Sequence, residues 1–489
     1  MLLGRPRRDG LVGGHSYVES SNLDAKPQNF DQIKDHFKND NTTFKQRYWR
    51  NSQYYKNNGI VFLLIQGESI ATDAWANNPG YTYITLAKLY NADVYQLEHR
   101  CFGFSRPEPD MKVSSLSTCN VDQALEDIKT FISAQNSNVY KNVKPKWITF
   151  GGSYPGFLSA AFRMKYPEYT VGAVASSAPM LWTLDFFQYA QVVQDTMFDV
   201  DVNCGNAIST AFTQMQTLSL TTTGRNQLST YFNLSPAFNA NVTQLDIDNF
   251  FANIYGYFQD VTQYTYDGRN EATRGGLDVT NLCKIMTDNT VPDYIKRVNN
   301  VVLWYNKLNK ITQTTMDNSY AASIKTLANT TFDDENASQD NAASRGWMWL
   351  CCNEMGVLQT TDQGYNIFQQ IVPLNYYIDM CTQMFSADIN IKRIRDRNTA
   401  FYKRYGGIDH YTATNIVLPN GAYDPWHSLG LNWNNTDLHV SSILIPKAGH
   451  CSDMYPIYPG EAAGLKNARD YINKEVAYFL GVPVVPFPQ

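Results

Sequence analysis

The sequence predicts an α/β fold in which a core sheet with flanking helices is interrupted by a large inserted helical domain. Short apolar runs alternate with helical stretches in the first part of the chain, which is the order of βαβαβ units. Residues 147–163 read as a buried strand, a glycine-rich turn and a helix. Amphipathic helical stretches dominate residues 185–396, and the length of 489 residues exceeds the usual size of one domain.

The elements expected before residue 185 follow one another in a regular order. Residues 1–45 are polar and turn-rich, and we expect them to form an N-terminal surface segment. Two predicted strands, Tyr48–Tyr55 and Ile60–Ile65, flank the turn signal Asn57-Asn58-Gly59, which favours a hairpin. The other expected elements are a helix over Tyr81–Tyr90, a strand over Asp93–Leu97, a helix over Ser117–Gln135, the strand before Gly151 and a strand over Tyr169–Ser176.

The strand pattern returns near residue 415, so the C-terminal part of the chain is expected to complete the core. Strands are predicted at Asn415–Asn420 and Val440–Ile445, followed by a closing helix over Glu461–Leu480. The helical insertion between the two parts includes the stretches Ala190–Val200, Ile247–Phe258 and Asp293–Leu308. The predicted domains are therefore the surface segment 1–45, an α/β core formed by 46–184 and 397–489, and a helical insertion or lid formed by 185–396.

A serine stands at the predicted strand-to-helix turn. Gly151 and Gly152 precede Ser153, and small residues are needed there because a Cβ would clash where the chain doubles back. The following helix directs unpaired N–H groups toward the serine, which suits an anionic intermediate. Pro155 replaces the second glycine of the G-x-S-x-G pattern, although the first turn of a helix accepts proline. The alternative is a glycine-rich loop whose serine only caps a helix.

Composition, cysteines and sequons favour a secreted or lumenal globular protein whose signal peptide is missing from this numbering. Hydrophobic residues make up 43% of the chain, and a net charge of −5 without a basic face argues against nucleic acid as a partner. No apolar run reaches the length of a transmembrane helix. The eight cysteines are Cys101, Cys119, Cys204, Cys283, Cys351, Cys352, Cys381 and Cys451, and the six sequons lie at Asn41, Asn233, Asn241, Asn329, Asn336 and Asn434. A cytosolic enzyme with free thiols is the alternative.

A serine nucleophile needs a base within hydrogen-bond reach and an acid that orients the base. His450 follows the strand that ends at Ile445, and Asp424 follows the preceding strand. The order Ser…Asp…His along the chain is that of α/β-hydrolases. Asp453 and Asp379 are alternative acids. His427 is an alternative pocket residue, and Asp424 before a proline could also start a turn.

An oxyanion hole is expected beside the serine. In this arrangement one donor is the backbone N–H after the nucleophile, here that of Tyr154. The second donor is expected from the Gly67-Glu68 loop, which follows the strand that ends at Ile65. The alternative for Gly67 is a purely structural turn.

Five segments resemble the serine peptidase family that contains lysosomal Pro-X carboxypeptidase, dipeptidyl peptidase II and thymus-specific serine protease. They are Glu98-His99-Arg100 with Gly103, Ser105 and Pro107; Gly151-Gly152-Ser153-Tyr154; Cys352-Asn353-Glu354 with Gly356, Gln359 and Thr360; Asn420-Gly421 with Asp424-Pro425-Trp426; and Ala448-Gly449-His450-Cys451-Ser452-Asp453. The resemblance extends from about Trp49 to the C-terminus, and residues 4–14 resemble nematode members such as contortin. Pro155 departs from the glycine of the family, which puts the turnover rate in question more than the mechanism.

The resemblance implies an α/β-hydrolase core with an inserted helical lid and cleavage after proline near one end of a peptide. It makes Ser153 the nucleophile, Asp424 the orienting acid and His450 the base. Homodimers are plausible in the family, and higher self-assembly stays open. The implied disulfides join Cys204 to Cys283 and Cys352 to Cys381, and the remaining pairs would be Cys101 with Cys119 and Cys351 with Cys451.

A pocket for proline needs flat apolar walls. The candidates for these walls are Met180, Trp182, Trp347, Trp349 and Trp426, although aromatic residues at helical spacing are more often core. Glu354 is a candidate for binding a substrate amine, which would favour release of dipeptides. Its alternative is a buried carboxyl group that bonds to the lid.

The sequence therefore predicts a secreted or lysosomal serine exopeptidase that cleaves peptides next to proline through an acyl-enzyme. No metal or organic cofactor is expected. The first alternative is a catalytically weak structural or self-assembling secreted protein on the same fold, in which Pro155 spoils the turn. The second alternative is an esterase or lipase.

Overall fold

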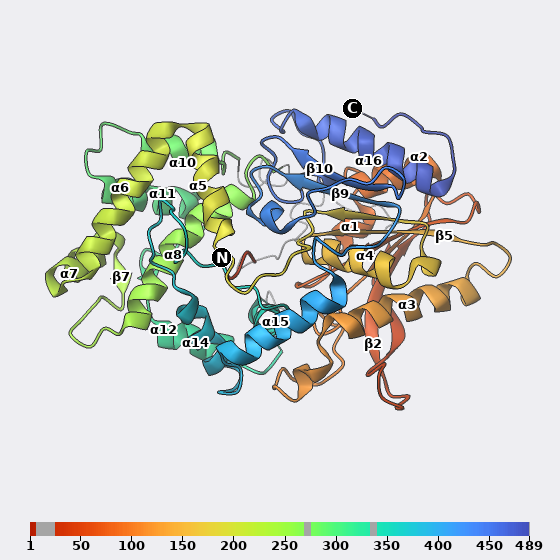
Figure 1. Ribbon diagram of the computed structural model, residues 1–489, viewed down its shortest axis with the longest axis horizontal. Coiled ribbons are helices and arrows are strands. Elements are labelled where there is room, and N and C mark those ends of the chain that lie inside the picture. The colour runs from red at the N-terminus through yellow and green to blue at the C-terminus, as the bar shows by residue number, and fades with distance from the viewer. Residues whose placement is uncertain (6–24, 268–274, 333–339, 489) are drawn as a thin grey trace.

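The computed structural model describes residues 1–5, 25–267, 275–332 and 340–488 (Figure 1). Its main sheet has eight strands in the order β1-β2-β4-β3-β5-β6-β9-β10. These strands are β1 Gln28–Ile33, β2 Thr43–Asn51, β3 Ile60–Ile65, β4 Asp93–Leu97, β5 Lys146–Gly152, β6 Gly172–Ser176, β9 Ile416–Gly421 and β10 Val440–Ile445. The strands from β4 to β10 pair in parallel, whereas β1 and β2 are antiparallel at one edge. The α/β class is confirmed, with the architecture of an α/β-hydrolase core.

The helices of the core cover both faces of this sheet. They are α1 Asp73–Asn77, α2 Thr82–Tyr90, α3 Val121–Asn138, α4 Tyr154–Lys165 and α16 Gly464–Leu480. Another helix, α15 Ile391–Tyr405, packs on α4 through the rings of Phe401 and Phe157. Alternation along β3 explains the two faces, because successive side chains of a strand point to opposite sides. Val61 and Leu63 pack with α3 and α4, whereas Phe62 and Leu64 pack with α2 and α16. The strand is therefore apolar throughout, as a strand buried on both faces must be.

A second group of helices lies beside the sheet and forms the left half of Figure 1. Its helices are α5 Gln188–Val200, α6 Val202–Ser219, α7 Thr222–Phe232, α8 Gln244–Gln263, α10 Val279–Met286, α11 Tyr294–Leu308, α12 Tyr320–Leu327, α13 Asp340–Leu350 and α14 Leu374–Met384. A two-stranded parallel ladder joins β7 Leu234–Ser235 to β8 Met316–Asp317. Among the described helices, none combines the length and apolar character needed to cross a membrane.

Two expectations about the N-terminal part are wrong. The predicted hairpin of β2 and β3 does not form, because β4 lies between them and pairs with both. Within residues 1–5 and 25–45, which the structure describes, the chain does not simply cover the surface. Residues 28–33 form the edge strand β1, and the side chains of Leu3 and Arg5 are each 2% exposed. The apolar signal of β1 is weak because its sequence is QNFDQI, and an edge strand buries few of its side chains.

Three disulfides join Cys101 to Cys119, Cys204 to Cys283 and Cys352 to Cys381. The predicted fourth pair, Cys351 with Cys451, does not form. The reason is topological, since Cys351 packs in the cluster on the α3 side of the sheet and Cys451 packs in the cluster on the α16 side. An even number of cysteines therefore misled the prediction.

The sequons of the described residues are accessible to solvent. Exposed asparagines are found at Asn41, Asn233, Asn241, Asn329 and Asn434. Asn336 lies outside the described residues. Accessibility is necessary for N-glycosylation, so these five positions stay candidate sites.

Candidate active site

Ser153 occupies a strained turn between β5 and α4. Its backbone has φ 64° and ψ −131°, a combination that non-glycine residues seldom adopt. Such a conformation costs on the order of 1–3 kcal/mol and is concentrated at functional sites. Its N–H donates to the carbonyl oxygen of Ser176 at 2.8 Å, which ties the turn to the end of β6. The residue predicted as nucleophile therefore lies at the C-terminal edge of the sheet, where α/β enzymes bind their ligands.

The glycines around Ser153 are required by contacts with backbone. A Cβ on Gly151 would lie 2.1 Å from the carbonyl oxygen of Pro155, and a Cβ on Gly156 would lie 2.7 Å from that of Ser176. Gly156 thus provides the close approach of α4 to β6. The ring of Pro155 points elsewhere, toward Gly67, where a Cβ would lie 2.4 Å from Pro155 Cγ. The turn accommodates proline because the helix keeps its close contact through the next residue.

His450 and Asp424 form a buried pair beside this turn. Nδ1 of His450 lies 2.7 Å from Oδ2 of Asp424, and both side chains are fully buried. A carboxylate only accepts hydrogen bonds, so the proton of the neutral imidazole lies on Nδ1 and Nε2 keeps its lone pair. Within the described part of the chain, Nε2 has no hydrogen-bond partner. The imidazole is therefore oriented as a general base requires.

The loop of His450 packs directly on the nucleophile turn. A Cβ on Gly152 would lie 2.9 Å from Sγ of Cys451, and Cys451 N–H donates to the hydroxyl oxygen of Ser177 at 2.9 Å. The helical insertion holds the loop from the other side, because His450 N–H donates to the carbonyl oxygen of Gln263 at 2.7 Å. Gln263 lies at the end of α8, so core and insertion together fix the histidine.

The alternative residues make other contacts. His427 binds the backbone oxygen of Asp424 rather than its carboxylate. Asp379 lies in α14 of the insertion, where its charge affects Asp248 and Tyr320. The carboxylate of Asp453 accepts a hydrogen bond from Ser176 at 2.6 Å.

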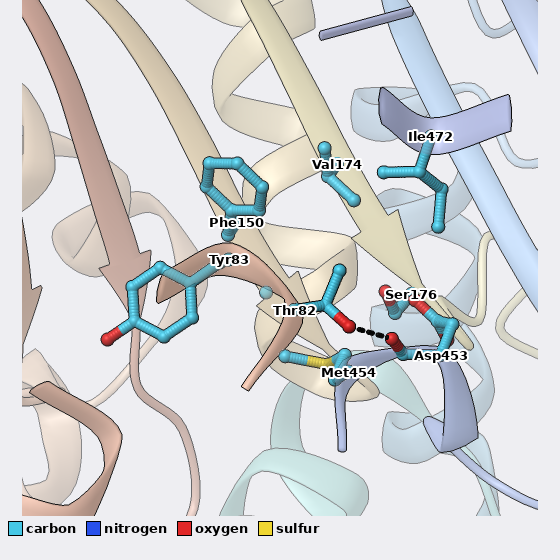
Figure 2. A pocket seen from close by; sticks show the side chains of 9 residues that line it. Thr82, Tyr83, Phe150, Val174, Ser176, Asp453, Met454 and Ile472 are labelled. Carbon is cyan, nitrogen blue, oxygen red and sulfur yellow. Dashed lines mark hydrogen bonds between the residues drawn. The ribbon is translucent and has the colours of Figure 1, made fainter. Parts of the chain in front are cut away.

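Asp453 belongs to a small, mostly apolar cavity behind the nucleophile strand. Figure 2 shows Asp453 and Ser176 at one end of this cavity and the rings of Tyr83 and Phe150 on its other side. Burial raises the pKa of Asp453 to about 6. The cavity lies on the α16 side of the sheet, whereas the predicted pocket tryptophans pack on the opposite side. It is therefore not the predicted proline pocket.

The Glu98-His99-Arg100 segment supports the turn from behind. His99 Nδ1 lies 2.6 Å from the carbonyl oxygen of Arg100, so this nitrogen carries the proton and Nε2 accepts from the Tyr154 hydroxyl at 3.0 Å. Burial lowers the pKa of His99 to about 4, which keeps the ring neutral. Glu98 pairs with Arg47 at 2.9 Å, and Arg100 pairs with Asp127. The segment thus fixes Tyr154, whose backbone N–H is the predicted oxyanion donor.

The predicted pocket residues separate into two groups. The ring centroids of Trp347 and Tyr154 lie 5.8 Å apart with an interplanar angle of 58°, and Trp426 bonds to Gln263 through its indole N–H at 3.1 Å. Trp182 lies 6.3 Å from Trp426, and Met180 is bonded to the loop that carries Trp426. Each of these four residues thus contacts Tyr154, Gln263 or the loop that carries Trp426. Trp349 faces away, because its indole N–H donates to the carbonyl oxygen of Cys119 at 3.2 Å.

Glu354 has a structural partner. Its two carboxylate oxygens lie 3.2 and 3.0 Å from the backbone N–H of Val121, the first residue of α3. A carboxylate is stabilised at a helix N-terminus, where N–H groups are unsatisfied. Burial raises the pKa of Glu354 to about 7. The contact favours the alternative in which Glu354 bonds the insertion to the core.

Two features of the site were not predicted from the sequence. Residues 2–5 lie between the core and the insertion, where Leu3 and Gly4 contact Trp347 and Trp426. The Glu68 side chain, beside the predicted oxyanion loop, is buried and has a pKa raised to about 7 by burial. Glu68 follows a predicted strand end, which was a usable signal, but residues 2–5 carry no local pattern that points to a site.

The profile of the family described as "Serine carboxypeptidase S28" matches residues 32–472. The chain belongs to the S28 family of serine peptidases. The Caenorhabditis elegans protein "Putative serine protease F56F10.1" is 48% identical over 468 residues, which cover 95% of this chain and 86% of that protein. Thymus-specific serine protease of Mus musculus is 28% identical over a region that covers 90% of this chain and 84% of that protein. Lysosomal Pro-X carboxypeptidase of Bos taurus is 27% identical over a region that covers 86% of this chain and 81% of that protein.

Burial of Glu354 predicts a pH-dependent stability for this S28 peptidase. Its pKa is about 7 in the folded chain and near 4.5 when exposed, so the folded state binds more protons between these values. Stability is therefore lost as pH rises through the folded pKa. Glu354→Gln keeps an oxygen for Val121 but cannot ionise. We expect the free energy of unfolding of the variant, relative to that of wild type, to increase by up to about 3 kcal/mol as the pH rises from about 4.5 to about 8.

Denaturant unfolding at several pH values measures this difference. The control is Glu168→Gln, at an exposed position, which should follow the wild-type pH profile. Parallel profiles for wild type and Glu354→Gln would show that the carboxyl group ionises as easily in the folded chain as in the unfolded one.

Proposed function

We propose that this chain is a serine exopeptidase that cleaves peptides next to proline, with Ser153, His450 and Asp424 as its catalytic residues. The observation that carries the proposal is the buried His450–Asp424 pair, whose loop packs on Gly152 directly before Ser153. Family membership supports serine-type peptidase chemistry. The name of the bovine relative supports cleavage next to proline.

The proposed mechanism follows from the hydrogen bonds of the pair. Ser153 Oγ attacks the carbonyl carbon of the scissile bond, and its proton passes to Nε2 of His450. Asp424 holds Nδ1–H and stabilises the imidazolium that forms. The backbone N–H of Tyr154 and one from the Gly67-Glu68 loop are proposed to bind the oxyanion. The imidazolium then protonates the leaving amine, and a water molecule, deprotonated by His450, hydrolyses the acyl-serine ester.

The aromatic surroundings support a proline subsite. The ring of Trp426 lies against Gly4, and the indole N–H of Trp347 donates to the carbonyl oxygen of Leu3. Proline packs well against aromatic rings of this kind. Three disulfides are typical of an oxidising compartment, so we also propose a secreted or lysosomal location. Homodimer formation stays a prediction from the family resemblance.

The test compares wild type with Ser153→Ala on peptides that present each end. Ala-Pro and Lys-Pro dipeptidyl reporters test dipeptide release, and a blocked peptide ending in Pro-Phe tests release of the C-terminal residue. Cleavage by wild type alone supports the proposal and decides which end is used. Turnover of short esters without peptide cleavage would favour an esterase. Failure of a folded wild-type chain to react with a fluorophosphonate would favour the structural alternative.

A further inference from the structure

The carboxyl group of Glu68 is buried in the site without a hydrogen-bond partner. Its side chain is 1% exposed, and neither of its carboxylate oxygens accepts a hydrogen bond from any described residue. Buried polar groups are nearly always hydrogen-bonded, because burying one without a partner is costly. The proposed triad makes no use of this side chain. An unsatisfied carboxyl group at this position therefore indicates a contact that a ligand completes.

The Glu68 carboxyl group interacts electrostatically with residues of the proposed site. Gly67, its neighbour, is in contact with Pro155 of the nucleophile turn. Burial is the main cause of the raised pKa of Tyr154, and the charges of Glu354 and then Glu68 add to it. The charge of His450 in turn acts on Glu68 and lowers its pKa, against the larger effect of burial. Glu68 is therefore near both the residue after the nucleophile and the proposed base.

A cation from the chain itself lies beside Glu68. Arg5 Nε donates to the backbone oxygen of Glu68 at 3.0 Å, and Arg5 Nη1 donates to the Ser344 hydroxyl at 2.8 Å. The charge of Arg5 also acts on the Glu68 carboxyl group and lowers its pKa. Arg5 thus places a positive charge beside Glu68, while these two hydrogen bonds go to the backbone oxygen of Glu68 and to Ser344, not to the carboxyl group.

Residues 2–5 are held as a bound peptide would be held. The carbonyl oxygen of Leu3 accepts from Trp347 Nε1 at 3.1 Å, and that of Gly4 accepts from Gln263 Nε2 at 2.8 Å. A Cβ on Gly4 would lie 2.6 Å from the ring of Trp426, so the backbone lies flat against this indole. The N-terminus accordingly lies between the helical half and the sheet half of the molecule (Figure 1).

We propose that Glu68 is a specificity-determining residue that receives a positively charged group of the substrate, and that the Arg5 guanidinium lies beside this subsite in the structure. The inference rests on the proposed function of the site. The cation is the free α-amino group of a peptide or a basic side chain, which share positive charge and N–H donors. A carboxylate binds both through charge-assisted hydrogen bonds.

Three dipeptidyl reporters test the proposal near neutral pH. Ala-Pro carries a free amine, acetyl-Lys-Pro carries only a side-chain cation, and acetyl-Ala-Pro carries no cation. We expect Glu68→Gln to lower the ratio of kcat/KM for cationic over neutral reporters by about tenfold to a hundredfold, the effect of losing one charge-assisted hydrogen bond. The matched control is Asp248→Asn, a buried carboxyl group of α8 that accepts a hydrogen bond from Gln244 and should keep the wild-type ratio. The reporter whose ratio falls identifies the source of the cation.

Arg5→Met provides a second measurement, since it keeps the length of the side chain without its charge. We expect a KM lower by about threefold or more for the cationic reporters, because an internal competitor is removed. In a Glu68→Gln background the same substitution should have no such effect. If Arg5→Met lowered KM equally in the wild-type and Glu68→Gln backgrounds, Arg5 and Glu68 would not act on the same subsite.

The outcomes separate this inference from the proposed function. If Ser153 reacts with a fluorophosphonate and reporters are cleaved, an unchanged ratio in Glu68→Gln overturns the Glu68 subsite alone. If only Pro-Phe peptides are cleaved, the corresponding comparison uses blocked peptides with and without a lysine, and an unchanged ratio again overturns it. If wild type is folded but neither labelled nor active, both the proposed function and the subsite are wrong.

Discussion

Asp424→Asn is expected to lower kcat for peptide cleavage by about 10⁴-fold while leaving the chain folded. The carboxylate of Asp424 accepts two hydrogen bonds. Oδ1 accepts from the backbone N–H of Trp426 at 3.0 Å, and Oδ2 faces Nδ1 of His450 at 2.7 Å. Asparagine has only one oxygen, and the N–H of Trp426 requires an acceptor. The amide NH₂ of the variant therefore faces His450.

An amide donor opposite Nδ1 selects the wrong tautomer. Nδ1 must then accept, so the proton of the neutral imidazole moves to Nε2. Nε2 can no longer take the proton of Ser153, and general-base catalysis is lost. Binding of substrate is little changed, because Asp424 is fully buried and does not contact peptide. The loss should therefore appear in kcat, with KM near the wild-type value.

The matched control is Asp453→Asn, which changes the other buried aspartate beside the histidine loop. Asp453 accepts a hydrogen bond from Ser176. Among the described residues, the carboxylate that bonds to a ring nitrogen of His450 is that of Asp424. We expect less than about a tenfold loss of kcat, since an asparagine oxygen can still accept from Ser176. A large loss in Asp453→Asn together with near wild-type activity in Asp424→Asn would make Asp453 the orienting acid.

Local patterns determined most of what could be predicted of the fold. The bounds of β3, β4 and β10 agree with the sequence prediction because each is a short apolar run between turn residues. The hairpin failed because a turn signal such as Asn57-Asn58-Gly59 is local, whereas β4 is a better partner from elsewhere in the chain. β1 was missed because an edge strand needs no apolar run.

The site residues likewise divide into those that local sequence patterns predicted and those that they did not. Asp424 and His450 were predicted as a pair because parallel strands bring their C-terminal ends to one edge of the sheet. The role of Gln263 could not be predicted, since its contacts reach Gly4, 259 residues away, and the loop of His450. Arg5 and Glu68 are 63 residues apart and meet only in the folded chain. Sequence patterns predict groups attached to regular elements, and contacts between distant loops depend on the whole fold.

Gly67→Ala is expected to lower kcat by about 10²–10³-fold, the effect of losing one oxyanion donor. The added Cβ would lie 2.4 Å from Cγ and 2.7 Å from Cδ of Pro155, distances that van der Waals contact does not allow. The pyrrolidine ring is rigid and belongs to the first turn of α4, so the Gly67-Glu68 loop must move instead. Its backbone N–H then leaves the position proposed for the oxyanion.

The double variant Gly67→Ala/Pro155→Gly tests this reason, because glycine at 155 removes the ring that the new Cβ would meet. We expect kcat of the double variant to lie within about tenfold of that of Pro155→Gly alone. Such non-additive effects of two substitutions are found for residues in contact and not for distant ones. Pro155→Gly alone should destabilise α4 by about 1 kcal/mol, since glycine lacks the fixed φ of proline. Its kcat also shows whether proline at this turn slows the enzyme. If the double variant is as slow as Gly67→Ala, the loss comes from the loop itself, and the proline that distinguishes this turn has no part in positioning the oxyanion donors.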